Sequence, residues 1–278
     1  MSGIPYGRFA AAVRHPAAGT KGSNGIMKTA VITGASSGLG VEFAKAVASL
    51  CPEAEEIWLI ARREEKLAQV ASLLEGKRTF VLPMDLTDID GYGKLREALE
   101  EKKPDIVYLI NNAGFGKLGD YQDIGARDHF DIATLNCAAP AAVVSTVLPY
   151  MKRGAHIINV CSIAAFAPTP RMTVYCSTKS FIYAFSRALG EELRKDGISV
   201  TAVCPGPMDT EFLPIAGIHG NSKMFNSLPR CNVREVAEKT IRASRRGRAV
   251  YTNKLLFKLY RIIAKILPHA LVVKFTKC

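Results

Sequence analysis

The chain alternates short apolar runs with longer stretches of helical length from residue 29 onward, and this alternation limits its possible folds more than any other feature. Short runs bounded by Gly, Pro, Asp or Asn lie at Thr29–Thr33, Ile57–Ala61, Thr79–Leu82, Ile106–Asn111, His156–Cys161 and Ile198–Val203. Helical lengths such as Leu39–Leu50, Glu64–Leu74 and Asp88–Lys102 separate them. Apolar strands that alternate with helices are typical of a parallel sheet covered on both faces. We therefore predict one doubly wound α/β domain over residues 28–253, with its ligand at the carboxyl ends of the strands.

The turn between the first predicted strand and the first predicted helix is rich in glycine. It reads Thr33-Gly34-Ala35-Ser36-Ser37-Gly38-Leu39-Gly40. Glycines at such a turn allow a tight bend and a close approach of the backbone to a pyrophosphate, whose charge is favourable at a helix N-terminus. The turn therefore predicts a Rossmann-type dinucleotide site, with contacts from Gly34, Ser36, Ser37, Gly38, Leu39 and Gly40.

The same turn also fits a different motif. Residues 34–38 match G-x-S-x-G, the turn that carries the nucleophilic serine of α/β-hydrolases. In that fold the loop that forms the oxyanion hole comes from a strand earlier than the one that leads to the serine, whereas here no predicted strand precedes Thr29–Thr33, the strand that leads into this turn. His219 and His269 also lack an evident carboxylate partner in the sequence. We therefore favour nucleotide binding over hydrolysis.

The end of the second predicted strand indicates which nucleotide is bound. An acidic residue about 20 residues past the glycines would bind the ribose 2′-hydroxyl of NAD. Here the strand ends in Ala61-Arg62-Arg63, with no acid at its tip. Two guanidinium groups suit a 2′-phosphate, which arginine can bind through two hydrogen bonds. Arg62 and Arg63 therefore predict NADP(H), although they could instead pair with Glu64 and Glu65 at the start of a solvated helix.

A set of polar residues in the second half of the chain predicts catalysis. Tyr175 and Lys179 are four residues apart and so share one helix face. Ser162 lies 13 residues before the tyrosine, at the carboxyl end of a predicted strand. Asn136 follows a helical stretch, and Asn111-Asn112-Ala113-Gly114 ends the fourth predicted strand.

In this order and behind that glycine turn, these motifs resemble the short-chain dehydrogenase/reductase family, over about Lys28–Thr210. The resemblance implies that Tyr175 is the acid/base and that Lys179 binds the nicotinamide ribose and lowers the tyrosine pKa. It further implies that Ser162 orients the substrate oxygen and that Asn136 holds a relay water. The cofactor contacts that it implies beyond the glycine turn and the two arginines are Asp85, Leu86, Asn112, Ala113, Gly114, Tyr175, Lys179, Pro205, Gly206, Met208 and Thr210.

The chemistry of these side chains agrees with that resemblance. A free tyrosine titrates near ~10 and is therefore a poor base at neutral pH. Lys179 and an oxidised nicotinamide are cations, which favour the phenolate of Tyr175. We expect an NADP(H)-dependent oxidoreductase that interconverts a carbonyl and a secondary alcohol. The alternative is a non-catalytic NADPH sensor or scaffold, against which the intact Ser162, Tyr175 and Lys179 argue.

Apolar residues near the motifs suggest the kind of substrate. A segment over about 206–228 contains Phe212, Leu213, Ile215, Ile218, Met224 and Phe225 and has Gly217 and Gly220 as potential hinges, which predicts a lid. Phe115, Phe166 and Met172 lie next to the motifs and could line the same cavity. These residues predict a bulky apolar carbonyl or alcohol, such as a steroid-like, fatty-chain or aromatic compound.

The charge of the chain is concentrated at its ends. The formal net charge is +12, but residues 29–222 alone carry −4. Residues 1–28 hold four basic residues and no acid, and residues 223–278 hold 14 basic residues against two acids. The basic ends contain no recognised nucleic-acid motif, and we expect no nucleic-acid partner. We interpret residues 1–27 as a disordered extension, with the working chain starting at Met27.

The C-terminal segment, residues 254–278, is basic and amphipathic. Lys254, Lys258, Arg261 and Lys265 form one helical stripe, and the opposite face holds Leu255, Leu256, Leu259, Ile262, Ile263 and Ile266. Such a helix can lie on an anionic membrane, here through residues 254–275, or pack on the domain or on a second subunit with its lysines in solvent. The sequence leaves both open, with the second favoured.

Cysteine content and hydropathy indicate the compartment. The seven cysteines form no C-x-x-C pair, so neither a disulfide framework nor a zinc site is expected. Thiols of this kind favour a reducing, cytoplasmic location, with membrane association left open. No run reaches the roughly 18 to 20 consecutive apolar residues of a membrane-spanning helix, which argues against an integral membrane protein. The family resemblance implies a homo-oligomer, either a dimer or a tetramer.

Overall fold

The computed structural model describes residues 26–220, 222 and 226–276. Its centre is a seven-stranded parallel sheet with the strand order β3-β2-β1-β4-β5-β6-β7. The order reverses beside β1, which is the mark of a doubly wound fold. The predicted Rossmann-type fold is thereby confirmed. The strands are β1 (Lys28–Thr33), β2 (Glu56–Ala61), β3 (Arg78–Pro83), β4 (Asp105–Asn111), β5 (Met151–Val160), β6 (Ser199–Val203) and β7 (Val250–Tyr251).

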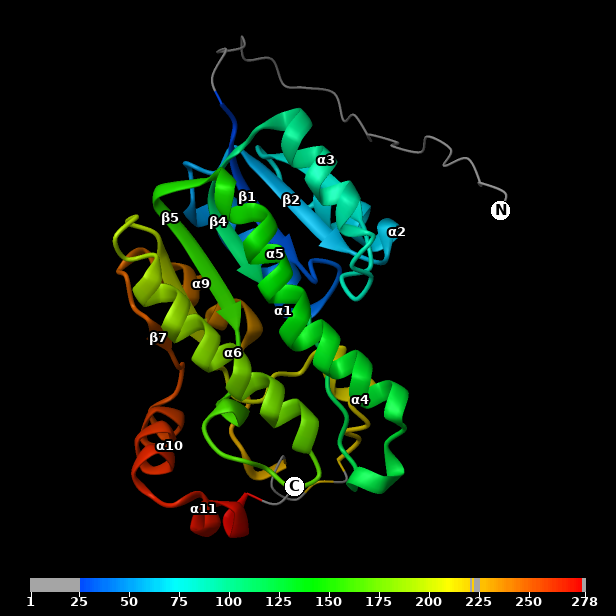
Figure 1. Cartoon of the computed structure of the whole chain (residues 1–278), viewed down its shortest axis with the longest axis vertical. Helices are drawn as coiled ribbons and strands as arrows, with labels where there is room; N and C mark the ends of the chain where they lie inside the picture. The colour runs from blue at the N-terminus through cyan, green and yellow to red at the C-terminus, as the bar shows by residue number, and fades with distance from the viewer. Residues whose placement is uncertain (1–25, 221, 223–225, 277–278) are drawn as a thin grey trace, which may run out of the picture.

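Helices cover both faces of the sheet (Figure 1). One face holds α1 (Gly38–Leu50), α2 (Glu64–Ser72) and α9 (Val233–Arg245). The other holds α3 (Tyr92–Lys102), α5 (Ala139–Val147) and α6 (Thr173–Glu192). Beyond the carboxyl ends of the strands lie α4 (Ala126–Ala133), α7 (Phe212–Ile215), α10 (Leu255–Ile266) and α11 (His269–Phe275).

The strands read as continuous apolar runs because both of their faces are buried. In β1, Ala30 and Ile32 belong to the core under α1 and α9, whereas Val31 belongs to the core under α3 and α5. In β2, Leu59 belongs to the core under α1 and α9, and Trp58 belongs to the core under α3 and α5. Successive side chains of a strand point to opposite faces, so a central strand covered on both faces has no position that faces solvent.

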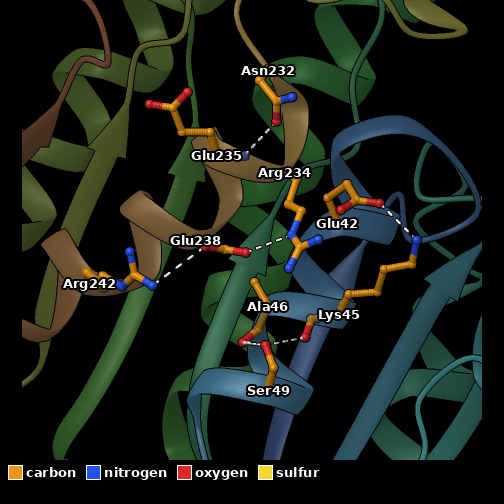
Figure 2. Close-up of polar contacts among 9 residues, drawn as sticks. All are labelled: Glu42, Lys45, Ala46, Ser49, Asn232, Arg234, Glu235, Glu238 and Arg242. Carbon is orange, nitrogen blue, oxygen red and sulfur yellow. Dashed lines mark hydrogen bonds and ion pairs between the residues drawn. The ribbon is translucent and has the colours of Figure 1, made fainter.

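Helix α9, the last of the helices that cover the faces of the sheet, packs beside α1 (Figure 2). It begins after Asn232, whose Oδ1 accepts a hydrogen bond from the backbone N–H of Glu235 at 2.9 Å. On its surface, Glu238 accepts a hydrogen bond from Arg234 Nε at 2.8 Å. Exposed pairs of this kind contribute little, so the packing depends on the buried Val236 and Ile241.

One helical run among the described residues is long and apolar enough to cross a membrane. It covers Ala126–Tyr150 and has a mean hydropathy of 1.5 over its most apolar 18 residues. Length and composition therefore do not exclude a membrane span by themselves. In the fold, however, Val143 and Val147 of this run lie in the core under the sheet, and Asn136 is buried with hydrogen-bonded partners. We interpret it as a core helix.

The C-terminal helices pack on the domain through a face that the sequence did not indicate. The side chains of Phe257 and Ala264 on α10 and Val272 on α11 are buried. The broader apolar face predicted from the sequence, with Leu255 and Ile266 at its centre, points to solvent. At the other end, Met27 is tied to the sheet, because its carbonyl accepts a hydrogen bond from Asp105 N. Of the extension predicted over residues 1–27, only Ile26 and Met27 are among the described residues.

Candidate active site

A cavity of about 840 Å³ lies at the carboxyl ends of the strands. Parallel strands end at one edge of the sheet, so the loops that follow them converge there. All the residues expected at the site contribute to the cavity wall except Gly40 and Asn136. They are Gly34, Ser36, Ser37, Gly38, Leu39, Arg62, Arg63, Asp85, Leu86, Asn112, Ala113, Gly114, Ser162, Tyr175, Lys179, Pro205, Gly206, Met208 and Thr210.

The glycine turn is pressed against the end of β4. Gly34 has a positive φ of 64°, and a Cβ at Gly40 would lie 2.1 Å from the carbonyl oxygen of Gly34. Asn112 Nδ2 donates to the carbonyl oxygens of Thr33 and Gly34, each at 3.1 Å. No side chain caps the first turn of α1 at Ser37, so the backbone there is open to the cavity. The space left by the glycines and the uncapped helix N-terminus fit a pyrophosphate.

An ion-pair cluster lies beside this turn, on the side of β2. Arg63 Nη2 donates to Ser36 Oγ at 3.1 Å and to Glu211 Oε2 at 2.9 Å. Lys66 Nζ donates to the other oxygen of Glu211 at 2.7 Å. These two hydrogen bonds lower the pKa of Glu211 to about 2, so its carboxylate is charged at neutral pH. The cluster joins the start of α2 to the residue that precedes α7.

Arg62 and Asp85 form a second, weaker pair at the same end. Their closest atoms, Nη1 and Oδ2, are 3.9 Å apart. Asp85 Oδ1 accepts hydrogen bonds from the backbone N–H and the hydroxyl of Thr87, at 2.9 and 2.8 Å. Burial acts to raise the pKa of Asp85, but these hydrogen bonds and the charge of Arg62 outweigh it and lower the pKa. Asp85 and Arg62 both line the cavity.

Ser162, Tyr175 and Lys179 meet across the cavity from the glycine turn. Ser162 follows β5, its hydroxyl acts to lower the pKa of the Tyr175 phenol, and its Oγ accepts a hydrogen bond from Ala164 N at 3.1 Å. Lys179 Nζ donates to the carbonyl oxygen of Val160, the last residue of β5, at 2.9 Å. It lies 5.6 Å from the centroid of the Tyr175 ring. One turn of α6 and one strand end therefore hold a hydroxyl, a phenol and an amine together.

Burial governs the protonation of this group. It raises the pKa of Tyr175 above its ordinary value, and the hydrogen bond from Ser162 offsets only part of that effect. Burial also lowers the pKa of Lys179, whose side chain is only 5% exposed. The lowering of the tyrosine pKa expected from the sequence is not seen among the described side chains. At neutral pH, Tyr175 holds its proton and is set up as a proton donor.

Asn136 acts behind the cavity wall. It lies in a single turn of π-helix, Thr134–Ala138, between α4 and α5. Its Oδ1 accepts from Phe115 N at 3.0 Å, and its Nδ2 donates to Phe115 O at 2.8 Å and to Thr178 Oγ1 at 3.0 Å. Its side chain therefore joins the loop after β4 to the helix that carries Tyr175.

The remaining wall of the cavity is largely apolar. Phe212 packs on Tyr175 with ring centroids 5.4 Å apart. Of the other apolar residues predicted there, Phe115, Met172, Leu213 and Ile215 line the cavity, whereas Phe166 and Ile218 do not. Met224 and Phe225 of the predicted lid lie outside the described residues.

Several residues of the site escaped the sequence analysis. Thr33 Oγ1 accepts from the backbone N–H groups of Asn112 and Ala113 at 3.0 and 3.2 Å, and its position at a strand end before a glycine was the available signal. Glu211 and Lys66 gave no such signal. Neither did the C-terminal side chains that form part of the wall, which are Leu256, Phe257, Tyr260, Phe275 and Thr276.

Comparison with known proteins identifies the class. Residues 28–215, more than half of the chain, match the short chain dehydrogenase family. The chain belongs to this family and is an oxidoreductase of its class. An uncharacterized oxidoreductase from Staphylococcus saprophyticus is 28% identical over 233 residues, which cover 82% of this chain and 95% of that protein.

Two solved structures are similar along most of the chain. A short-chain dehydrogenase from Sphingobium yanoikuyae in complex with NADPH is 28% identical, with a TM-score of 0.73 and coverage of 87% of this chain and 97% of that one. A bulky-bulky ketone specific alcohol dehydrogenase from Comamonas testosteroni is 27% identical, with a TM-score of 0.68 and coverage of 87% and 96%. The Sphingobium yanoikuyae structure holds NADPH, and a structure of the same fold from Burkholderia phymatum holds NAD.

Proposed function

We propose that this chain is an NADP(H)-dependent oxidoreductase that interconverts a bulky apolar ketone and its secondary alcohol. The observation that carries the proposal is the meeting of Ser162, Tyr175 and Lys179 in the same cavity as the glycine turn. A hydroxyl and a protonated phenol that converge on one point suit a carbonyl oxygen, which both can bind by hydrogen bonds.

The nucleotide would lie along the cavity from the glycine turn to Lys179. The turn would hold the pyrophosphate, and Asp85 with Leu86 would contact the adenine side. Pro205, Gly206, Met208 and Thr210 follow β6 and would contact the nicotinamide side. Once bound, the cofactor supplies a hydride to the carbonyl carbon or accepts one from the alcohol carbon.

The protein's own groups handle the proton and the orientation. In the reductive direction, Tyr175 Oη donates its proton to the substrate oxygen, which agrees with the raised pKa of this phenol. Ser162 holds the same oxygen and stabilises negative charge on it. Lys179 fixes the end of β5 through Val160 and places a cation near the phenol. Asn136 positions the loop after β4 through its two hydrogen bonds to Phe115, and we propose this role beside the relay water that the family resemblance implies.

The substrate class follows from the cavity wall. Phe212, Leu213 and Met172 line the cavity together with Tyr175, and Phe212 packs on its ring, so the wall beside the phenol suits an apolar substrate. The similar alcohol dehydrogenase from Comamonas testosteroni is specific for bulky-bulky ketones, which supports the same class here. The test is a screen of steroid-like, fatty-chain and aryl ketones, followed by NADPH absorbance. Turnover only of small polar carbonyls would overturn the proposed substrate class.

The choice of NADP(H) over NAD(H) is tested at Arg63. In Arg63→Ala, we expect the Kd of NADPH to rise roughly 10- to 100-fold, since a charge-assisted hydrogen bond contributes about 1.5–3 kcal/mol. The Kd of NADH should stay within about twofold. Arg96→Ala on α3 is the matched control, because Arg96 is exposed and far from the cavity wall. Equal losses for both nucleotides would exclude a 2′-phosphate contact by Arg63.

We expect the carboxylate of Glu211 to weaken binding of the same 2′-phosphate. Its carboxylate occupies Arg63 and Lys66, so a 2′-phosphate must compete with it for both cations. In Glu211→Gln, we expect NADPH to bind about two- to fivefold more tightly, the effect of losing a pair of exposed ion pairs. Titration of the variant with NADPH and NADH by fluorescence measures the change. Weaker NADPH binding would mean that Glu211 supports the site.

Two further proposals concern the assembly and the location of the protein. We propose a homo-oligomer, a dimer or a tetramer, to be measured by light scattering. The six described cysteines are free thiols, five of them buried, which supports a reducing cytoplasmic location. We also propose domain limits at residues 28 and 253 and a lid over residues 206–228. Peripheral contact of residues 254–275 with a membrane is a further proposal.

A further inference from the structure

The helices α10 and α11 expose an unusual amount of apolar surface. Six large side chains define this α10–α11 surface: Leu255, Leu259, Ile262, Ile263, Ile266 and Phe275. Leu255, Ile266 and Phe275 are 71%, 74% and 83% exposed. Single exposed apolar residues are common on proteins, but a group this large marks a surface that contacts something other than water.

The surface is not a core face that failed to pack. On α10, the buried Phe257 and Ala264 face the domain, and Leu255, Leu259, Ile262 and Ile266 lie about half a turn away on the opposite side. A helix on the surface of a soluble domain has one apolar stripe and one polar side. This helix has two apolar sides, so the second one requires its own partner.

Charge indicates the partner. Lys258 and Lys265 flank the apolar stripe of α10 and are exposed, and Lys274 is exposed on α11. Residues 239–278 contain no acid at all. A second copy docked face to face would bring these cations together with no acidic partner from the same segment. An anionic bilayer offers both an apolar interior and the opposite charge.

The same surface borders the cavity. Leu256 and Phe275 are exposed and also line the cavity wall, together with Phe257 from the buried side of α10. α10 and α11 lie together beyond the strand ends, on the side where the cavity lies (Figure 1). An apolar molecule in contact with the α10–α11 surface is therefore already at the wall of the cavity.

We propose that the α10–α11 surface rests on an anionic lipid bilayer and that the cavity takes its substrate from that bilayer. The first half of the proposal stands on exposure and charge alone. The second half rests on the proposed function, and it specifies substrates that partition into lipid. Docking is peripheral: α10 is held to the domain by Phe257 and Ala264 and lies along the membrane plane.

Flotation of the full chain with vesicles tests the docking. We expect flotation with vesicles of phosphatidylcholine and about one third phosphatidylserine at low salt, and reduced flotation at high salt. The double variant Ile262→Ser/Ile266→Ser should lose binding by tenfold or more on these vesicles. The variant Lys258→Gln/Lys265→Gln should lose about tenfold on anionic vesicles and little on phosphatidylcholine alone. Ile89→Ser and Lys94→Gln, exposed positions elsewhere, are the controls.

Activity on a water-soluble aryl ketone separates this proposal from the proposed function. None of the four substituted positions of the α10–α11 segment lines the cavity, so both variants should keep that activity. For a lipid-partitioned ketone, vesicles should raise the rate of the natural chain and not that of Ile262→Ser/Ile266→Ser. An active chain that does not float overturns the docking alone, and a floating chain without reductase activity overturns the function alone. Dissociation of an oligomer by Ile262→Ser/Ile266→Ser, without flotation of the natural chain, would make the surface a contact between copies.

Discussion

Tyr175→Phe should lower kcat/KM for ketone reduction by about a thousandfold and leave NADPH binding unchanged. The substitution removes one oxygen, the proton donor of the proposed mechanism, and general acid catalysis contributes typically about 10²- to 10⁴-fold. The ring remains, so its packing on Phe212 at 5.4 Å between centroids should persist. Stopped-flow turnover and a fluorescence titration with NADPH measure the two quantities on the same preparation.

Tyr183→Phe is the matched control for that experiment. Tyr183 lies two turns further along α6, packs edge-on to Phe166 and does not line the cavity. It should keep full activity. If Tyr175→Phe stays within tenfold of the natural chain, another group donates the proton and the proposed role of Tyr175 is wrong.

Lys179→Met should lower kcat/KM by about two orders of magnitude and change its pH dependence. Methionine has a similar length but no charge, so the phenol of Tyr175 loses the cation that lies 5.6 Å from its ring. A nearby cation favours the phenolate, and its removal therefore raises the pKa of Tyr175. In alcohol oxidation, where the phenolate accepts the proton, the acidic limb of the pH–rate profile should move to higher pH.

The pH profile distinguishes this effect from a loss of structure. The substitution also leaves the part-buried carbonyl oxygen of Val160 without its 2.9 Å donor, at a cost of about 1 kcal/mol of stability, the low end of the range for an unpaired buried group. A lower Tm is therefore expected in any case. Lys195→Met, at an exposed position after α6, should change neither quantity. A reduced rate with an unshifted profile would limit Lys179 to a structural role.

The sheet could be predicted closely because its strands are buried on both faces. β1, β2, β3, β4 and β6 each begin or end within a residue of the predicted runs. β5 begins at Met151, five residues earlier than predicted, because Met151 pairs with Ile106 of β4 ahead of an irregularity that contains the exposed Lys152, Arg153 and Gly154. β7 has only two residues and exists through its pairing with Ala202 and Val203, so no pattern along the chain marks it.

The sequence predicted those site residues that directly follow a strand. It did not predict contacts between segments that are far apart in the chain. Ser162, Asn112 and the glycine turn each follow a strand, and the carboxyl ends of parallel strands share one edge. Arg63 and Glu211, by contrast, are 148 residues apart in sequence. The sequence also showed that one face of α10 is apolar, but the face that packs is set by where the chain returns to the domain. That return depends on Phe257 and Ala264, two residues too few to form a recognisable stripe.

The contact between Phe257 and Gly206 couples the position of α10 to that of the loop after β6. The ring of Phe257 fills the place of a side chain at Gly206, where a Cβ would lie only 2.1 Å from a ring carbon. α10 therefore cannot tilt or slide without moving the backbone that follows β6. Truncation of the C-terminal helices would uncover that backbone to solvent and remove part of the cavity wall.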